Sequence, residues 1–130
     1  MTEQFDIVIV GGGLVGASMA LALANSRYSV ALLEGRAPAP LPQDESWDAR
    51  VYAISPGNKQ FLRDIGAWQR MPPKRLAAVH EMSIHGDRKG HGLQFSAADV
   101  GGNELTTILE NRLLQDALWQ GLAECPNVTV

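Results

Sequence analysis

Residues 5–16 read Phe-Asp-Ile-Val-Ile-Val-Gly-Gly-Gly-Leu-Val-Gly, an apolar run that stops at three glycines. The Ile and Val content of residues 5–10 predicts a buried strand, because strands covered on both faces are almost continuously apolar. Residues 14–26 are dense in Ala, Leu and Met and predict a helix that is buried on most sides. Residues 28–34 predict a second buried strand. Strand, glycine turn, helix and strand in this order indicate a βαβ unit with a parallel sheet.

The glycine turn fits the pattern G-x-G-x-x-G at Gly11, Gly13 and Gly16. In such a turn the first glycine permits a tight exit from the strand, and the second lets the backbone approach a pyrophosphate. The third glycine lets the helix pack close to the sheet. Leu14 and Val15 would contribute backbone N–H groups at the positive end of the helix dipole, where phosphates bind. The motif therefore predicts a dinucleotide-binding site.

Glu34 lies at the end of the second predicted strand, where dinucleotide-binding turns carry an acidic residue. A carboxylate there accepts hydrogen bonds from ribose hydroxyls and repels a 2′-phosphate, which disfavours NADP at this turn. The alternative is an ordinary glycine turn, with Glu34 as a surface acid. The turn does not by itself distinguish FAD from NAD, because both present an ADP moiety to the same groove.

Charge and composition exclude several classes of function. The chain has 130 residues, enough for one domain, and its 11 Lys and Arg against 14 Asp and Glu give a net charge of −3. That balance gives no electrostatic case for binding nucleic acid or an anionic membrane. The single cysteine, Cys125, excludes an internal disulfide and a Cys-based zinc site.

The sequence shows no leader and no apolar span, so we expect a soluble cytoplasmic protein. Peripheral contact with the inner membrane stays open.

The rest of the chain predicts helices and a hairpin. Ser55-Pro56 predicts the start of a short helix that ends at Gly66. We expect the apolar residues of this helix, Phe61, Leu62 and Ile65, to be buried. The other expected elements are a loop at 35–46, strands at 79–84 and 93–97 joined by the turn 86–92, a helix at 108–124 and a strand at 128–130. Because a domain seldom stops on the first residues of a buried strand, we expect the chain to be the front part of a longer protein.

The N-terminal part of the chain resembles the FAD fingerprint of the glutathione-reductase-like flavoproteins. Ala20, Leu23, Val30 and Glu34 fall at the spacings of that pattern. Arg27 stands where the family usually has a glycine that ends the helix with a positive φ. This departure implies a different turn at the end of the helix.

Later segments resemble class A flavin monooxygenases and, more narrowly, the aromatic-ring hydroxylases of ubiquinone biosynthesis. These segments are residues 48–55, residues 61–68 with their Gly-x-Trp ending, and residues 108–111 followed by Leu114 and Leu118. The resemblance implies an α/β fold: a Rossmann-like βαβ FAD-binding domain of the glutathione-reductase type, incomplete, with a small β-hairpin insertion. Residues 1–130 would be the N-terminal part of that domain. The family's Asp-Gly and Gly-Asp segments and its substrate domain are expected beyond residue 130.

The resemblance also implies an activity. Hydroxylases of this class use NAD(P)H to reduce FAD, and O2 to hydroxylate an activated ring, here of the polyprenyl-phenol type. The implied partners are a small aromatic substrate and O2, with a membrane surface or a biosynthetic complex left open and no nucleic acid. We expect the 130-residue chain alone to be inactive. Two alternatives are a stand-alone dinucleotide-binding module without catalysis and the front half of an NAD-dependent dehydrogenase. Residues 48–55 and the predicted hairpin argue against the dehydrogenase.

Two further cofactor residues follow from the resemblance. Arg50 sits where relatives place an arginine beside the flavin pyrophosphate, and a guanidinium suits phosphate charge. The alternative for Arg50 is a surface salt bridge to Asp48 or Glu45. Asn111 sits where relatives have a polar side chain at the ribityl chain, or it is a helix N-cap. Together with the fingerprint, the expected cofactor-binding residues are Gly11, Gly13, Leu14, Val15, Gly16, Glu34, Arg50 and Asn111.

No side chain stands out as a catalytic acid, base or nucleophile, as expected where the flavin carries the chemistry. Arg112 is interpreted as a solvated helix position. His80, His85 and His91 lie close together in the sequence, but a strand and a glycine-rich turn separate them, so we expect no metal site. Trp119 is interpreted as a core-packing residue of the last helix.

Overall fold

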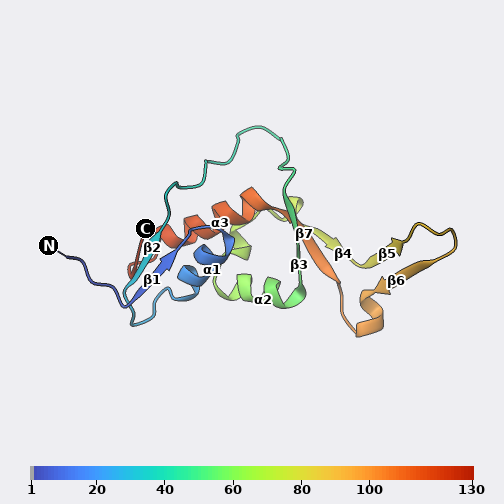
Figure 1. The fold of residues 1–130 in the computed structure, drawn as a ribbon, viewed down its shortest axis with the longest axis horizontal. Coiled ribbons are helices and arrows are strands. Elements are labelled where there is room, and N and C mark those ends of the chain that lie inside the picture. Colours follow the sequence, from blue (N-terminus) through green and yellow to red (C-terminus); the bar gives the residue numbers. More distant parts are fainter. Residues whose placement is uncertain (1) are drawn as a thin grey trace.

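The computed structural model describes residues 2–130 and arranges them along one long axis (Figure 1). At one end, β1 (Ile7–Val10), β2 (Val30–Leu33) and β8 (Val128–Thr129) form a parallel sheet in the order β1-β2-β8. Helix α1 (Leu14–Ala22) connects β1 to β2, and α3 (Asn111–Ala123) leads into β8. The two helices pack against each other, and α1 also packs against β1 and β2. The predicted βαβ unit and the final strand are both confirmed.

The prediction that β1 is a buried strand is wrong. Ile7 and Ile9 pack against the core, whereas Val8 is 55% exposed and Val10 is 82% exposed. In the part of the chain that the structure describes, nothing covers the second face of β1. Helix α1 is likewise open on one side, where Val15 is 85% exposed. β2 is buried at its first three residues, because it lies between two strands and packs against α1.

Helix α1 ends through a contact with a distant part of the chain. Asn25 adopts a left-handed φ of 59°, which asparagine tolerates better than most residues. The Asn25 N–H donates to Asn127 Oδ1 at 3.0 Å, and Asn127 Nδ2 donates to the carbonyls of Leu23 and Tyr28, both at 2.9 Å. The left-handed position at this helix end is therefore residue 25. Arg27 therefore does not have to adopt the positive φ that the family's glycine has at this position.

A second, antiparallel sheet lies in the middle of the molecule. It contains β3 (Val51–Ile54), β7 (Thr106–Glu110) and β4 (Ala77–Val79) in the order β3-β7-β4. The helix predicted at 108–124 therefore starts later, at residue 111, because residues 108–110 pair with β3 and β4. The strand predicted at 79–84 is also wrong as one element, since it is divided between β4 and the hairpin described below.

Helix α2 (Pro56–Asp64) follows β3 as predicted. Ser55 Oγ accepts from the Asn58 N–H at 3.3 Å, which is an N-cap. Gly66 has a φ of +77° just beyond the helix end. Leu62 is buried, but Phe61 is 41% exposed, so its predicted burial is wrong. Short 3-10 turns at Trp68–Arg70 and Pro73–Arg75 lead from α2 to β4, and Trp68 is buried.

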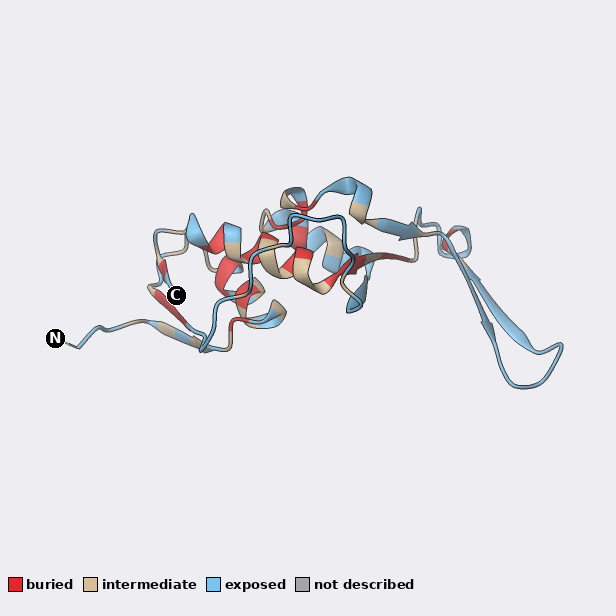
Figure 2. Cartoon of the chain, turned by 90° about the horizontal axis from the view of Figure 1, so that it is seen from above, coloured by how far each residue is buried: buried red, intermediate tan, exposed pale blue. Residues whose placement is uncertain are grey.

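A β-hairpin projects from the far end of the molecule. It consists of β5 (Glu81–His85) and β6 (Gly92–Ser96), followed by a 3-10 turn at Ala97–Val100. Every residue of β5 and every residue of β6 up to Phe95 is exposed, and Figure 2 shows the projecting hairpin in the colour of exposed residues. Among residues 2–130, no helix has both the length and the apolar character needed to cross a membrane.

Candidate dinucleotide-binding site

The glycine turn joins β1 to α1 through close backbone contacts. Gly11 has a φ of +100°, and its N–H donates to the Leu33 carbonyl at 2.8 Å. A Cβ placed on Gly16 would lie 1.8 Å from the Gly11 carbonyl oxygen, so only glycine permits this approach of α1 to the strand exit. Gly13 occupies the N-cap position of α1 without a side-chain cap. The first N–H groups of the helix therefore have no intrahelical partner.

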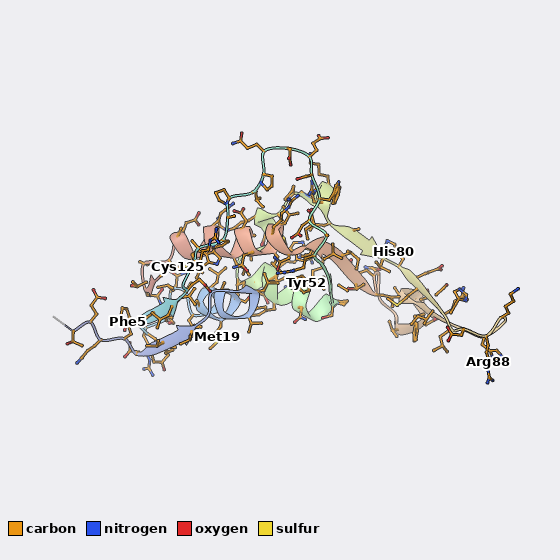
Figure 3. The ribbon with its side chains drawn as sticks, turned by 45° about the horizontal axis from the view of Figure 1, so that its top comes forward. Phe5, Met19, Tyr52, His80, Arg88 and Cys125 are labelled. Atoms are coloured by element: carbon orange, nitrogen blue, oxygen red, sulfur yellow. The ribbon has the colours of Figure 1, made fainter. Side chains whose placement is uncertain are left out.

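An open cavity of about 780 Å³ lies on the outer side of this turn. A Cβ built on Gly13 would meet no atom within 4 Å, so the turn itself leaves this side open. Met19 and Tyr52 also line the cavity, while Arg88 lies at the remote tip of the hairpin (Figure 3). Seven of the eight predicted cofactor-binding residues line it, namely Gly11, Gly13, Leu14, Val15, Gly16, Arg50 and Asn111.

Glu34, the eighth predicted residue, lies beside the turn. Its Oε2 accepts from the Gly12 N–H at 2.7 Å, and its Oε1 accepts from the Arg36 N–H at 3.1 Å. The Gly12 N–H in particular lowers the pKa of the Glu34 carboxyl below its usual value. Glu34 thus holds the turn as well as being the predicted partner of a ribose.

Two side chains of α3 bond to the carbonyl of the same residue, Gly12. Gln115 Nε2 donates to the Gly12 carbonyl at 2.7 Å, and Trp119 Nε1 donates to it at 2.9 Å. The interpretation of Trp119 as a core-packing residue was therefore incomplete, and Gln115 was missed. The one sequence signal available was their spacing, since Gln115 and Trp119 follow Asn111 at intervals of one helical turn.

Arg50 and Asn111 lie side by side at the edge of the cavity. The Asn111 N–H donates to the Arg50 carbonyl at 2.9 Å, where β3 meets the start of α3. Within residues 2–130, the Arg50 guanidinium forms none of the ion pairs, so the suggested bridges to Asp48 or Glu45 are absent there. Asn111 is the first residue of α3, and Glu110 occupies the N-cap position. The N-cap alternative for Asn111 is therefore wrong.

A buried carboxylate supports this edge from behind. Glu110, only 1% exposed, accepts from Arg75 Nε and Nη2 at 2.7 Å and from the Asp48 N–H at 2.7 Å. Burial alone would raise the pKa of Glu110, but the Asp48 N–H and the Arg75 guanidinium outweigh it and lower that pKa. Arg112 lies 3.4 Å from the same carboxylate and also donates to the Ser46 carbonyl. The interpretation of Arg112 as a solvated position is wrong.

The remaining chemically reactive side chains lie apart from the cavity. His80 Nδ1 lies 2.7 Å from the Asn103 carbonyl, and His85 and His91 are exposed on the hairpin. Among the residues described, no group of three His, Cys, Asp or Glu side chains is arranged to hold a metal ion. Cys125 Sγ donates to the Gly121 carbonyl at 3.2 Å, and burial raises the pKa of this thiol.

Known proteins resemble the chain over its full length. It is 36% identical over 131 residues to 3-demethoxyubiquinol 3-hydroxylase of Escherichia coli. That alignment covers 100% of this chain and 33% of the relative. It is also 36% identical over 137 residues to the mitochondrial ubiquinone biosynthesis monooxygenase COQ6 of Drosophila melanogaster, covering 99% of this chain and 28% of the relative. The chain thus spans about a third of the length of these curated relatives.

Solved structures of flavin-dependent monooxygenases share the fold. PqsL of Pseudomonas aeruginosa, described as a probable FAD-dependent monooxygenase, matches with a TM-score of 0.73 at 17% identity, covering 97% of this chain and 32% of that one. The p-nitrophenol 4-monooxygenase PnpA of Pseudomonas putida matches with a TM-score of 0.64 at 24% identity. The match covers 94% of this chain and 29% of that one. At these identities the likeness concerns the α/β fold alone.

A family match agrees with the geometry of the glycine turn. The sequence model of the family described as FAD dependent oxidoreductase matches residues 6–77, which is more than half of the chain. The matched residues run from β1 through the turn, α1 and β2 to the first residue of β4. The chain belongs to the FAD-dependent oxidoreductase family.

Proposed function

We propose that the intact protein binds FAD at the glycine turn and hydroxylates an aromatic ring of the polyprenyl-phenol type in ubiquinone biosynthesis, using NAD(P)H and O2. The observation that carries the proposal is the single cavity that unites the glycine turn with Arg50 and Asn111. The names of the relatives, 3-demethoxyubiquinol 3-hydroxylase and ubiquinone biosynthesis monooxygenase, support the substrate class. We assign the βαβ unit to the Rossmann-like type of FAD-binding fold.

The residues around the cavity fit the parts of FAD. The open side of Gly13 and the free N–H groups at the start of α1 suit the pyrophosphate. The Arg50 guanidinium, which forms no ion pair among the described residues, would add a fixed positive charge there. Glu34 would accept from the adenosine ribose, and Asn111 would contact the ribityl chain. When bound, FAD supplies the redox chemistry that links the nicotinamide to oxygen.

The first test is flavin binding by the intact protein expressed from its complete gene. We expect FAD to bind and NAD to compete weakly. Arg50→Gln should weaken FAD binding about tenfold to a hundredfold, because a hydrogen bond to a charged group is lost. The matched control is Arg88→Gln at the hairpin tip, which should leave the FAD Kd unchanged. Preferential binding of NAD would overturn the FAD assignment and favour a dehydrogenase.

The second test is turnover. Under anaerobic conditions, NADH or NADPH should bleach the bound flavin, and the faster of the two identifies the reductant. With air and a short-chain demethoxyubiquinol, the product should be heavier by one oxygen atom. Reduction of the flavin without any oxygenated product from such phenols would contradict the proposed substrate class.

A further inference from the structure

We propose that Gln115 and Trp119 are positioning residues that set the direction of the phosphate-binding N–H at Gly13. The inference rests on the proposed binding of FAD at the glycine turn. Neither residue belongs to the fingerprint. Trp119 does not line the cavity, whereas Gln115 lies at its edge with its amide nitrogen bonded to the Gly12 carbonyl. Both would act through the peptide that joins Gly12 to Gly13.

The Gly12 residue is held on both of its polar groups by side chains. Its carbonyl accepts from Gln115 Nε2 at 2.7 Å and from Trp119 Nε1 at 2.9 Å. Its N–H donates to Glu34 Oε2 at 2.7 Å. Gly12 is buried, so these bonds are made away from bulk water, where leaving them unmade is costly. The backbone at this residue therefore has one strongly preferred orientation.

The orientation matters because of peptide geometry. The Gly12 carbonyl and the Gly13 N–H belong to the same planar trans peptide, so they point in opposite directions. Two donors on α3 draw the carbonyl toward that helix. The Gly13 N–H is thereby turned away from α3, and Gly13 lines the open cavity. An N–H fixed in this direction before the ligand arrives pays no reorganisation cost when a phosphate binds.

Helix α3 is suited to hold the peptide in place. Asn111, Gln115 and Trp119 are spaced four residues apart and lie on one face of the helix. The opposite side of α3 is locked into the core by Leu113 and Ala117, which are 7% and 1% exposed. The face that would contact the ribityl chain through Asn111 thus also orients the turn that would bind the pyrophosphate.

The same contact explains the middle glycine of the triplet. Residue 12 is an x position of the pattern and has no left-handed φ. A Cβ placed there would lie 2.8 Å from Trp119 Cζ2 and 3.0 Å from Glu34 Cβ. Trp119 therefore excludes a side chain at residue 12 by its size, in addition to donating to its carbonyl.

The test measures FAD affinity and the melting temperature of the flavin-free form for matched variants of the intact protein. Gln115→Met and Trp119→Phe each remove one donor and keep most of the packing. Each should raise the FAD Kd by about twofold to tenfold, the usual range for one hydrogen bond. The matched controls are Gln120→Met, on the exposed side of α3, and Trp68→Phe, in the core under α2. Both should leave the FAD Kd unchanged, and Trp68→Phe should lower the melting temperature.

A double variant tests the contact between residue 12 and Trp119. Gly12→Ala should raise the FAD Kd about tenfold or more, as expected for an overpacked contact. The added methyl group meets the outer ring of Trp119, so Gly12→Ala combined with Trp119→Phe should cost a smaller factor than Gly12→Ala alone. If the FAD Kd of the double variant rose by the product of the two single effects, residue 12 and Trp119 would not be in contact.

The outcomes are distinguishable. A wild-type protein that binds no FAD overturns the proposed function and this inference with it. Wild-type binding with an unchanged Kd in Gln115→Met and Trp119→Phe overturns the inference alone, even if their melting temperatures fall. Weaker binding in both variants, normal binding in both controls and relief of Gly12→Ala by Trp119→Phe would support it.

Discussion

The two ends of the molecule are organised in opposite ways. At the glycine turn, the geometry depends on residues far apart in the chain, since Gly12 bonds to partners 103 and 107 residues away. At the β5–β6 hairpin, the register pairs Met82 with Phe95 and Ile84 with Leu93, and all four side chains are exposed. In the hairpin the paired residues are close in sequence. The turn needs a packed core to be held in its binding geometry.

The most severe test of this contrast is a glycine exchange. Gly16→Ala should prevent α1 from packing on β1, because its Cβ would lie 1.8 Å from the Gly11 carbonyl oxygen. We expect loss of soluble folded protein and of bound flavin, measured by yield, circular dichroism and flavin content. Gly57→Ala is the control: no atom lies within 4 Å of its Cβ. In helix α2 it should stabilise the protein by about 0.5–1 kcal/mol. A well-folded Gly16→Ala protein would refute the close approach.

A second test concerns the buried carboxylate between the two ends. Glu110→Gln should destabilise the protein by about 3 kcal/mol, because it leaves the Arg75 guanidinium, whose side chain is 14% exposed, without its counter-charge. The folded-state pKa of Glu110 is lowered, so its stabilising effect is complete above the unfolded pKa, about 4.3. That effect is lost as the pH falls through the folded pKa. Urea denaturation at several pH values should show the wild type and the variant converging in acid. If the difference in unfolding free energy between the wild type and the variant stayed constant in acid, the result would contradict the ion pair.

The smallest expected effect comes from one chemical change made in both regions. Leu118→Ala removes a side chain that is 0% exposed and should cost about 3 kcal/mol. Leu93→Ala removes a side chain that is 62% exposed and should cost less than about 0.5 kcal/mol. The difference between the urea midpoints of the two variants measures how much more the core contributes to stability than the hairpin does. Equal losses would mean that the hairpin face is covered in solution.

The βαβ unit and the position of its glycine turn could be predicted from the sequence, because the pattern that identifies them is made by neighbouring residues. Residues 5–34 contain the apolar runs, the glycines and the acidic strand end in one continuous pattern. The N-cap of α2 at Ser55 could be predicted for the same reason, since its partner Asn58 is three residues away. Seven of the eight predicted cofactor residues line one cavity, because the turn, the residue before β3 and the start of α3 meet there, and Glu34 lies beside it.

What could not be predicted depends on pairs that are distant in sequence. Glu110 meets Arg75 35 residues away, and no local pattern identifies either as half of a buried pair. The first residues of the predicted helix at 108–124 instead pair with β3 and β4, which helical periodicity cannot reveal. The exposure of Phe61 has a similar origin. Periodicity indicates which face of a helix is apolar, but not whether another element covers it.

The contacts of Asn127 have a consequence for the order of events during synthesis. Its side chain closes the end of α1 through the Leu23 carbonyl, 104 residues earlier, and β8 supplies the second neighbour of β2. At about 5–20 residues per second, a ribosome takes roughly 5–20 s to cover that distance. Until then, β2 keeps a free backbone edge and α1 lacks its final cap. The part of the protein that is made first is thus completed late, and a nascent chain in this interval needs protection from pairing with its neighbours.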